Sequence, residues 1–464
     1  ELTDVYERKQ RGLPARSAPK LHDPRGRNQR YESRDADVVS VDAVIGTAED
    51  QIAITTGTLV REWRGKGRRY FHYKTDTPLM FAVPVLSARY AVREDTWNDV
   101  ALKIFHHPTH TFNLDRMIRS MQASLEYFTR EFGPYQFKEL RIVEFPRYAS
   151  FARAHPHTIA YSEGGAFLTR VEEGDVDRPF FVTAHEIAHQ WWGGQLSGAR
   201  VAGVGMISET LAQYGAMMVM EKTYGRDQVK KFYDFELDGY LRARGVFRGS
   251  EVPLLTMWDQ SYLYYNKGAV AMYTLKEQIG EERVNAALRS FLNRYRDAGP
   301  PYATSLDLYR EFQAVTPDSM KYLLVDLFET ITLWDVRVKA ARAEQISDSA
   351  YRVSVDVIGK KVRADSMGVE TEVPMNDIVE IAVFAGNERP YFERHRIRSG
   401  EQRITLTVSR KPESVGVDPY HNLIQRVKDG KVVGLDEQST SPWTAEYRAR
   451  QYDSTRVRIP LPNF

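Results

Sequence analysis

The stretch that decides the fold of this chain reads Phe180-Phe181-Val182-Thr183-Ala184-His185-Glu186-Ile187-Ala188-His189-Gln190-Trp191-Trp192. It contains the pattern His-Glu-x-x-His, in which His185 and His189 stand four residues apart. On a helix, residues four apart lie on the same face, so both imidazoles can reach a single metal ion. Glu186 lies about 100° around the helix from His185, where it can accept a proton from a water molecule at the metal. The pattern therefore predicts a catalytic zinc site.

The residues on either side predict that this stretch is helical. Asp177 can cap the amino end, Pro179 suits the first turn, and Gly193-Gly194 ends the run. A chance match is the alternative, because short motifs recur by accident in long chains. The helical setting and a suitably spaced third ligand favour the metal site.

A third ligand is needed, since catalytic zinc takes three protein ligands and keeps one position open. Glu209 is the candidate, near the start of a second helix that Ser208 can cap and that Gly225 ends. The Gly-rich segment 193–205 lets the chain turn back, so that the two helices can pack side by side. Two alternatives stay open: Glu209 as a first-turn acid favoured by the helix dipole, and Glu221, further along the same helix, as the ligand.

Composition limits the function classes. The 464 residues hold 64 Lys and Arg against 62 Asp and Glu, and a net charge of +2 gives no reason to expect a nucleic-acid partner. Without cysteine, disulfides and thiolate metal sites are excluded. No apolar run reaches transmembrane length, and the chain begins with Glu1 and no signal peptide. We expect a processed product, or a fragment of a longer chain.

Changes in hydrophobic period divide the chain into five parts. Residues 1–37 are basic and proline-containing, typical of a linker or a surface strap. Residues 38–108 predict an N-terminal antiparallel β-sheet domain, 109–333 a helix-rich domain, and 334–428 a β-sandwich. Residues 429–464 form a tail with little pattern. The predicted fold class is α+β and multidomain.

Two further motifs could carry chemistry. Three tyrosines lie in the run Tyr262-Leu263-Tyr264-Tyr265, directly before an expected helix. A phenol near a zinc site can donate to the oxyanion that forms when water attacks a carbonyl, but the pattern does not select one tyrosine. Glu163, beside Gly164 and Gly165, could bind a cationic group of a ligand; an ordinary loop Glu is the alternative.

Taken together, these residues resemble the zinc aminopeptidases of the aminopeptidase N and leukotriene-hydrolase family. The resemblance rests on His-Glu-x-x-His with the distant Glu209, followed by Tyr265-Asn266-Lys267-Gly268-Ala269, and it covers roughly residues 40–425. The order of β-domain, thermolysin-like helical domain and β-sandwich is also that of the family.

The resemblance implies a role for each matching residue. His185, His189 and Glu209 would hold one zinc ion per chain, and Glu186 would be the base. Tyr265 would stabilise the tetrahedral intermediate. Glu163 falls where the family's Gly-x-Met-Glu-Asn motif holds the free α-amino group of the substrate.

The sequence also departs from the family. The spacing from His189 to Glu209 is one residue longer than usual, and Ser208-Glu209-Thr210 replaces Asn-Glu-Gly. Gly-x-Met-Glu-Asn is replaced by Ala160-Tyr161-Ser162-Glu163-Gly164, which weakens the case for cleavage at the amino terminus.

The resemblance extends to a bacterial subgroup fused to ABC transporter permeases. It implies that the partner is a membrane permease segment of the same parent chain, and it favours an extracytoplasmic soluble domain. We expect a zinc metallopeptidase that removes amino-terminal residues from peptides. A thermolysin-like endopeptidase is one alternative. A non-catalytic peptide-binding domain of a permease assembly is the other, although such a domain has no need of Glu186.

Overall fold

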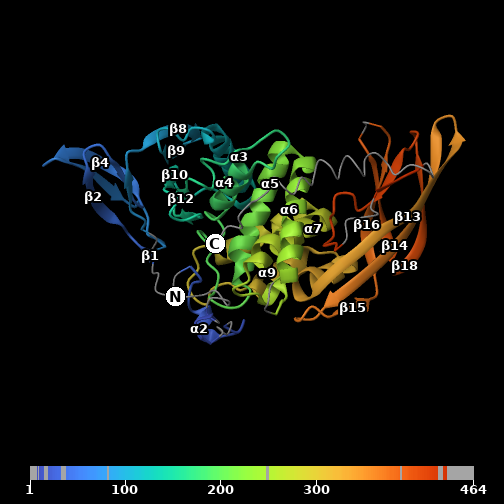
Figure 1. Ribbon diagram of the computed structural model, residues 1–464. Helices are drawn as coiled ribbons and strands as arrows, with labels where there is room; N and C mark the ends of the chain where they lie inside the picture. The colour runs from blue at the N-terminus through green and yellow to red at the C-terminus, as the bar shows by residue number, and fades with distance from the viewer. Residues whose placement is uncertain are drawn as a thin grey trace.

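The protein is described by a computed structural model that covers residues 8, 10–14, 19–32, 38–80, 83–246, 250–386, 389–426 and 432–435. Figure 1 shows a helical middle with β-sheets at its two ends. This arrangement of N-terminal antiparallel sheets, central helices and C-terminal sheets confirms the predicted α+β class. Most of the predicted tail 429–464 lies outside the described residues, apart from the short strand β20 (Val432–Gly434).

Three small antiparallel sheets make up the N-terminal end. One has the order β2 (Asp42–Ala48), β5 (Arg68–Lys74), β4 (Thr58–Gly65). The others pair β3 (Ile52–Ile54) with β7 (Leu86–Ala88), and β1 (Val38–Val39) with β6 (Leu79–Met80). Alternate residues of β5 point inward, and its Phe71 and Tyr73 pack on Ala53 in a small core of their own.

A five-stranded mixed sheet supports the helical middle. Its order is β11 (Ala152–His155), β12 (Thr158–Ser162), β10 (Glu139–Phe145), β9 (Val100–His106), β8 (Ala91–Trp97). The three inner strands are parallel, whereas β8 and β11 run antiparallel at the edges. The boundary predicted at residue 108 therefore cuts through this sheet. Strand periodicity identified β9 as a strand but does not reveal its partner, and its Leu102 and Ile104 are buried in the central core.

The helices of the middle follow in sequence. They are α3 (Leu114–Phe132), α4 (Arg178–Ala188), α5 (Leu211–Tyr224), α6 (Arg226–Val246), α7 (Gly268–Ile279), α8 (Glu281–Tyr295), α9 (Ser305–Val315) and the short α10 (Lys321–Leu324). Helix α9 begins at Ser305, but Ser305 is not its cap. Thr304 is the cap, in a reciprocal capping box with Asp307, and the Ser305 hydroxyl donates to the Leu255 carbonyl instead. No helix among the described residues combines the length and the apolar character that crossing a membrane requires.

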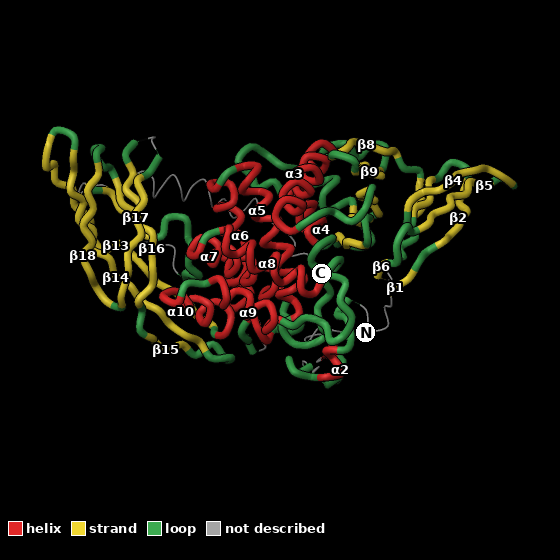
Figure 2. The backbone as a smooth tube through the Cα atoms, turned by 180° about the vertical axis from the view of Figure 1, so that it is seen from behind, coloured by secondary structure: helices red, strands yellow, loops and turns green. Residues whose placement is uncertain are grey.

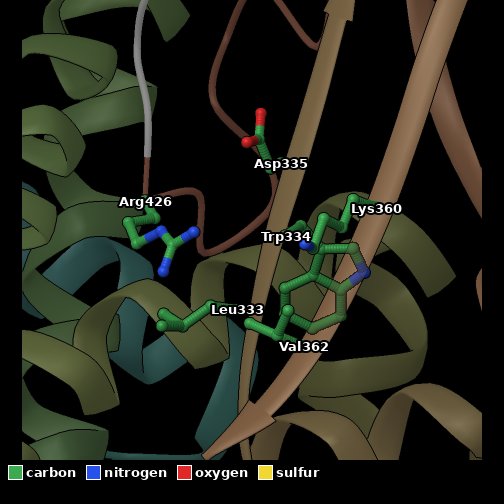
Figure 3. Close-up of a pocket in the computed structure, with 6 residues that line it drawn as sticks. All are labelled: Leu333, Trp334, Asp335, Lys360, Val362 and Arg426. Atoms are coloured by element: carbon green, nitrogen blue, oxygen red, sulfur yellow. The ribbon is translucent and has the colours of Figure 1, made fainter. Parts of the chain in front are cut away.

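Two four-stranded antiparallel sheets form the C-terminal end (Figure 2). The first joins β15 (Glu370–Val373), β14 (Ala350–Ala364), β13 (Ile331–Ser347) and β18 (Gly400–Val408); the second joins β17 (Tyr391–Arg398), β16 (Asn376–Phe384), β19 (Ser414–Val417) and β20. Buried residues of both, such as Val355 and Ile381, belong to the same core as the helices. A shallow crevice lies where β13 and β14 meet Arg426 (Figure 3), and no predicted site residue lines it.

Candidate metal centre

The helix α4 carries the His-Glu-x-x-His pattern, and its start is the one predicted. The Asp177 carboxylate accepts from the Phe180 N–H at 3.1 Å, and Pro179 stands in the first turn. The helix ends at Ala188, and His189 keeps helical backbone angles as its C-cap. The apolar face of α4 is completely buried, which fixes the direction of both imidazoles.

Close packing brings α5 alongside α4. A Cβ atom on Gly215 would lie 2.8 Å from the Phe128 ring and 3.4 Å from the Ala188 side chain. Glycine is therefore needed for the close approach to Phe128 of α3, while the contact with Ala188 of α4 is ordinary van der Waals contact. The expected side-by-side arrangement of the two helices is confirmed.

Glu209 lies in a widened turn that leads into α5. Residues Met206–Thr210 form a π-helical turn, and α5 follows directly. Contrary to the prediction, Ser208 does not cap the helix, because it lies inside this turn. Its hydroxyl donates to Glu209 Oε1 at 3.4 Å. Single π turns often occur at functional sites, where they redirect a side chain.

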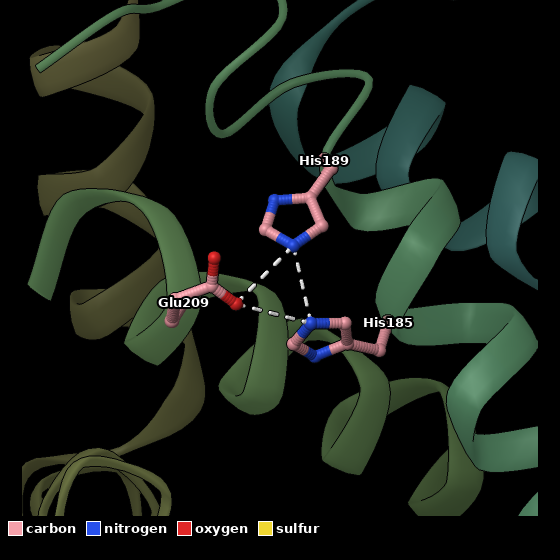
Figure 4. A group of neighbouring side chains, drawn as sticks. All are labelled: His185, His189 and Glu209. Carbon is pink, nitrogen blue, oxygen red and sulfur yellow. Dashed lines mark hydrogen bonds and ion pairs between the residues drawn. The ribbon is translucent and has the colours of Figure 1, made fainter. Parts of the chain in front are cut away.

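Three ligand atoms converge on one point (Figure 4). The Nε2 atoms of His185 and His189 are 3.1 Å apart. Glu209 Oε2 lies 3.4 Å from His185 Nε2 and 3.5 Å from His189 Nε2. Metal–ligand bonds of 2.0–2.1 Å in a tetrahedral site place neighbouring ligand atoms about 3.3 Å apart. The three atoms therefore form one face of a tetrahedron of the size that zinc requires.

The outer nitrogens of both imidazoles set their tautomers. His185 Nδ1 bonds the Gln213 side-chain oxygen at 2.9 Å, and His189 Nδ1 bonds the Trp192 carbonyl at 2.9 Å. Because both partners are acceptors, each Nδ1 carries the proton, and each Nε2 presents a lone pair inward. Two lone pairs and a carboxylate oxygen at such short separations need a cation between them.

The charges of this group agree with that reading. Burial disfavours a charged imidazole, but the Glu209 and Glu186 carboxylates outweigh it and raise the pKa of His189 to about 9. Burial also works against an ionised Glu209, yet the two imidazoles hold the pKa of its carboxyl well below the usual range. Both shifts show that the group favours a positive charge where the three ligand atoms converge.

Glu186 lies beside the three ligand atoms and is not one of them. Its side chain is 4% exposed, and burial raises the pKa of its carboxyl against the opposing pull of His185 and His189. The backbone of Ala154, in the edge strand β11, lies close enough to this carboxyl to oppose part of that rise in its pKa. A desolvated carboxylate with a raised pKa is suited to accept a proton.

The geometry distinguishes the three tyrosines. The Tyr265 hydroxyl lies within hydrogen-bonding reach of Glu209, and burial raises the pKa of this phenol well above its usual value. The phenol therefore stays protonated and can donate. Tyr264 accepts at its carbonyl from Thr210, and Tyr262 stacks on Tyr240.

A buried chain of hydrogen bonds, absent from the sequence prediction, supports His185 from behind. The Gln213 amide donates to Glu236 Oε1 at 3.3 Å, and the Asn266 amide donates to Glu236 Oε2 at 2.5 Å. The chain thus joins a metal ligand to the residue next to Tyr265. Gln213 lies one turn after Glu209 and could have been found from that spacing, whereas nothing local marks Glu236 in α6.

Glu163 lies in a different group. Its Oε1 accepts from the Arg147 backbone N–H at 3.0 Å, and its ligand atoms cluster with those of His110 and Glu144 at the carboxyl ends of the parallel strands. Gly164 and Gly165 follow it: Gly164 is exposed, and Gly165 packs against the Tyr161 ring. The strand that contacts Glu186 is β11 instead, so the contacts do not favour Glu163 as the anchor of an α-amino group.

Comparison with known proteins adds independent findings. Residues 112–323 match the model of the Peptidase family M1 domain, a region that contains His185, Glu186, His189, Glu209 and Tyr265. Endoplasmic reticulum aminopeptidase 2 of Homo sapiens is 24% identical over 216 residues, 44% of this chain and 22% of that protein. Probable aminopeptidase 1 of Sulfurisphaera tokodaii is 24% identical over 185 residues, 37% of this chain and 23% of that protein. The matches thus span less than a quarter of these curated relatives.

The fold has a counterpart among solved structures. The crystal structure of Legionella pneumophila aminopeptidase A in complex with aspartic acid superposes with a TM-score of 0.56 at 14% identity, over 85% of this chain and 45% of that one. At this identity the likeness concerns the fold alone. The family model and the curated relatives support the predicted relationship to the aminopeptidase N family and to metallopeptidases.

Proposed function

We propose that this chain is a zinc-dependent aminopeptidase that removes amino-terminal residues from peptides. The observation that carries the proposal is the convergence of His185, His189 and Glu209 at tetrahedral spacing, with Glu186 beside them. The match of residues 112–323 to a peptidase domain supports the same reaction class.

The ligand set favours zinc over harder cations, because two imidazoles and one carboxylate suit it and leave a fourth position open. When bound there, zinc supplies a Lewis acid that polarises the scissile carbonyl and activates water. Side chains of this protein carry out the proton transfers and stabilise the charge that develops on the substrate.

Glu186 is the base in this proposal. Its buried carboxylate accepts the proton of the attacking water and passes it on to the leaving amine. The Tyr265 hydroxyl donates a hydrogen bond to the oxyanion that develops on the substrate. The hydrogen bonds from Gln213 through Glu236 to Asn266 fix the position of His185 relative to the segment that carries Tyr265.

The edge strand β11 is where the substrate backbone would bind. It pairs with β12 on one side and is an edge of its sheet on the other, and the backbone of its Ala154 lies close to the Glu186 carboxyl. An extended peptide could add to this edge as a further strand, which would bring its scissile bond to the catalytic group. Strand addition by itself also suits internal cleavage, so a thermolysin-like endopeptidase is the second candidate.

The test combines metal analysis with matched substrates. The purified chain should hold one zinc per molecule and should hydrolyse aminoacyl chromogenic substrates and free-amino peptides, but not the same peptides with acetylated amino ends. Internal cleavage of acetylated peptides would replace the aminopeptidase with the endopeptidase. Stoichiometric zinc without hydrolysis of either substrate type would favour a peptide-binding domain.

The proposal extends to the setting of the protein. The resemblance to a subgroup fused to ABC transporter permeases suggests a membrane permease segment in the parent chain and an extracytoplasmic position for this domain. Cell fractionation and protease treatment of intact cells, followed by detection with an antibody to this domain, would test both points. Recovery in the soluble cytosolic fraction would contradict them.

A further inference from the structure

The N-terminal segment 19–32 lies against the helical middle rather than with the N-terminal sheets. In Figure 1 its helix α2 (Pro24–Arg27) lies beside the central domain, away from β2 and β4. Its partners are the loop that links the two ligand-bearing helices and the segment before α9. We call residues 19–32 the strap.

Backbone hydrogen bonds fix the strap along its length. Arg200 N–H donates to the carbonyls of Gly26 and Gln29 at 3.1 and 2.9 Å, and Tyr31 N–H donates to the Gly198 carbonyl at 3.0 Å. Gly26 fits so closely that a Cβ there would lie 2.7 Å from the Arg200 carbonyl oxygen. Such contacts need a particular backbone path, so the strap has one position on the loop.

Side chains anchor the end of the strap. Arg30 Nε donates to the Tyr302 hydroxyl at 3.1 Å, and the Tyr31 ring packs edge-on against Trp258 at 6.4 Å. Tyr31 is also close enough to Glu209 to feel its charge, which contributes to raising the pKa of the phenol. The strap therefore ends beside the metal centre.

Glu32, the last described residue of the strap, is the unexplained group. Both oxygens of its carboxylate are buried, and no described residue completes a hydrogen bond of normal geometry to either one, although the Ser197 hydroxyl lies nearby. Burial raises the pKa of Glu32 to about 7, against the effects of Ser197, Arg30 and His189. A buried carboxylate without full partners is costly and calls for a role.

The position of Glu32 indicates that role. A Cβ on Gly193 would lie 3.7 Å from Glu32 Oε1, 3.8 Å from His189 Nδ1 and 3.8 Å from Ser208 Oγ. Gly193 also has a φ of +107°, which favours glycine, so this spot stays free of a side chain. Around one point there are thus the strap carboxylate, the outer nitrogen of one metal ligand and the hydroxyl next to another.

We propose that Glu32 is a positioning residue of the metal centre, acting from outside the ligand shell on His189 and Ser208. This rests on the proposed zinc site. A carboxylate on the Nδ1 side of a ligating histidine orients the ring and makes its inner nitrogen a stronger donor. The Nδ1–H of His189 already donates to the Trp192 carbonyl, so Glu32 acts on this ring through its negative charge, from a segment more than 150 residues away in sequence.

The experiment measures zinc affinity by competition with a chromogenic chelator. E32Q keeps the size of the side chain and removes its charge, and we expect it to weaken zinc binding roughly 10- to 100-fold. E32D should recover part of the affinity. R27Q, which removes a 3.7 Å ion pair to Asp307 from the same strap, is the matched control and should bind zinc as the wild type does.

A second readout separates positioning from loss of structure. The visible spectrum of the cobalt-substituted protein should differ between E32Q and the wild type, while both show the same circular dichroism. Wild-type affinity and spectrum in E32Q would overturn the inference. So would a loss confined to KM for free-amino peptides, which would make Glu32 a substrate-binding group. A wild type that binds no zinc would instead refute the proposed function.

Discussion

The support of His185 by Gln213 gives a prediction with a matched control. Gln213→Leu keeps the approximate size of the side chain and leaves the His185 Nδ1–H without its 2.9 Å acceptor. It also removes the 3.3 Å donor to Glu236 Oε1. Loss of a partner from outside the ligand shell typically weakens metal affinity roughly 10- to 100-fold, or about 1.4 to 2.7 kcal/mol.

The same change lowers the free energy of unfolding of the metal-free protein. Each buried group left without a partner costs about 1–3 kcal/mol, so two such groups cost about 2–6 kcal/mol. Gln190→Leu is the control for this part. Gln190 is equally buried and bonds the His157 N–H at 2.9 Å and the His155 carbonyl at 3.0 Å, but neither group is a metal ligand.

The assays are urea unfolding of the chelator-treated proteins and zinc titration against a competing chelator. Both variants should lose comparable stability, and Gln213→Leu alone should lose zinc affinity. If Gln190→Leu weakened zinc binding as much as Gln213→Leu, the effect would reflect general loosening of the fold. The reasoning about the His185 tautomer would then be refuted.

Three further predictions concern the catalytic group. Glu186→Gln should retain zinc and lower kcat/KM at least about a thousandfold, because an amide cannot accept the proton; an active variant would exclude this base. Tyr265→Phe should retain zinc and lower kcat roughly 100- to 1,000-fold, as for loss of an oxyanion donor, whereas a change in KM alone would point to substrate binding. In the metal-free protein, the pKa of His189 is raised from 6.5 to about 9, so the stability it gains from Glu209 is present below pH 6.5 and lost as the pH rises through about 9. The melting temperature of the chelated protein should fall across that window, and that of the zinc-loaded protein should not; equal behaviour of the two would contradict the assignment.

The sequence predicted the elements better than it predicted their assembly. Helix α4 begins at the position predicted from Asp177 and Pro179, because helix capping depends only on residues that are neighbours in the sequence. The pairing of β9 with β10 was missed, since a period of two identifies a strand and not its neighbour. The predicted cap Ser208 makes no capping hydrogen bond, because it lies inside the π-helical turn before α5.

The candidate site divides in the same way. The spacing of His185 and His189 on one helix is a local property, and Glu209 follows at a distance that one loop can span. Glu236 and Glu32 could not be predicted, because their relation to the imidazoles arises only from packing of α6 and of the strap. Glu163 was linked to the substrate by its position in the sequence, but the strands carry it to a group with His110 and Glu144.

The strap also has a consequence for the order in which the protein can be completed during synthesis. Arg30 and its partner Tyr302 are 272 residues apart, so the strap leaves the ribosome well before the residue that anchors it. At about 5–20 residues per second, that delay is roughly 14–54 seconds. A nascent chain that has reached α8 already contains His185, His189 and Glu209, yet it still lacks the residue that holds the end of the strap beside them.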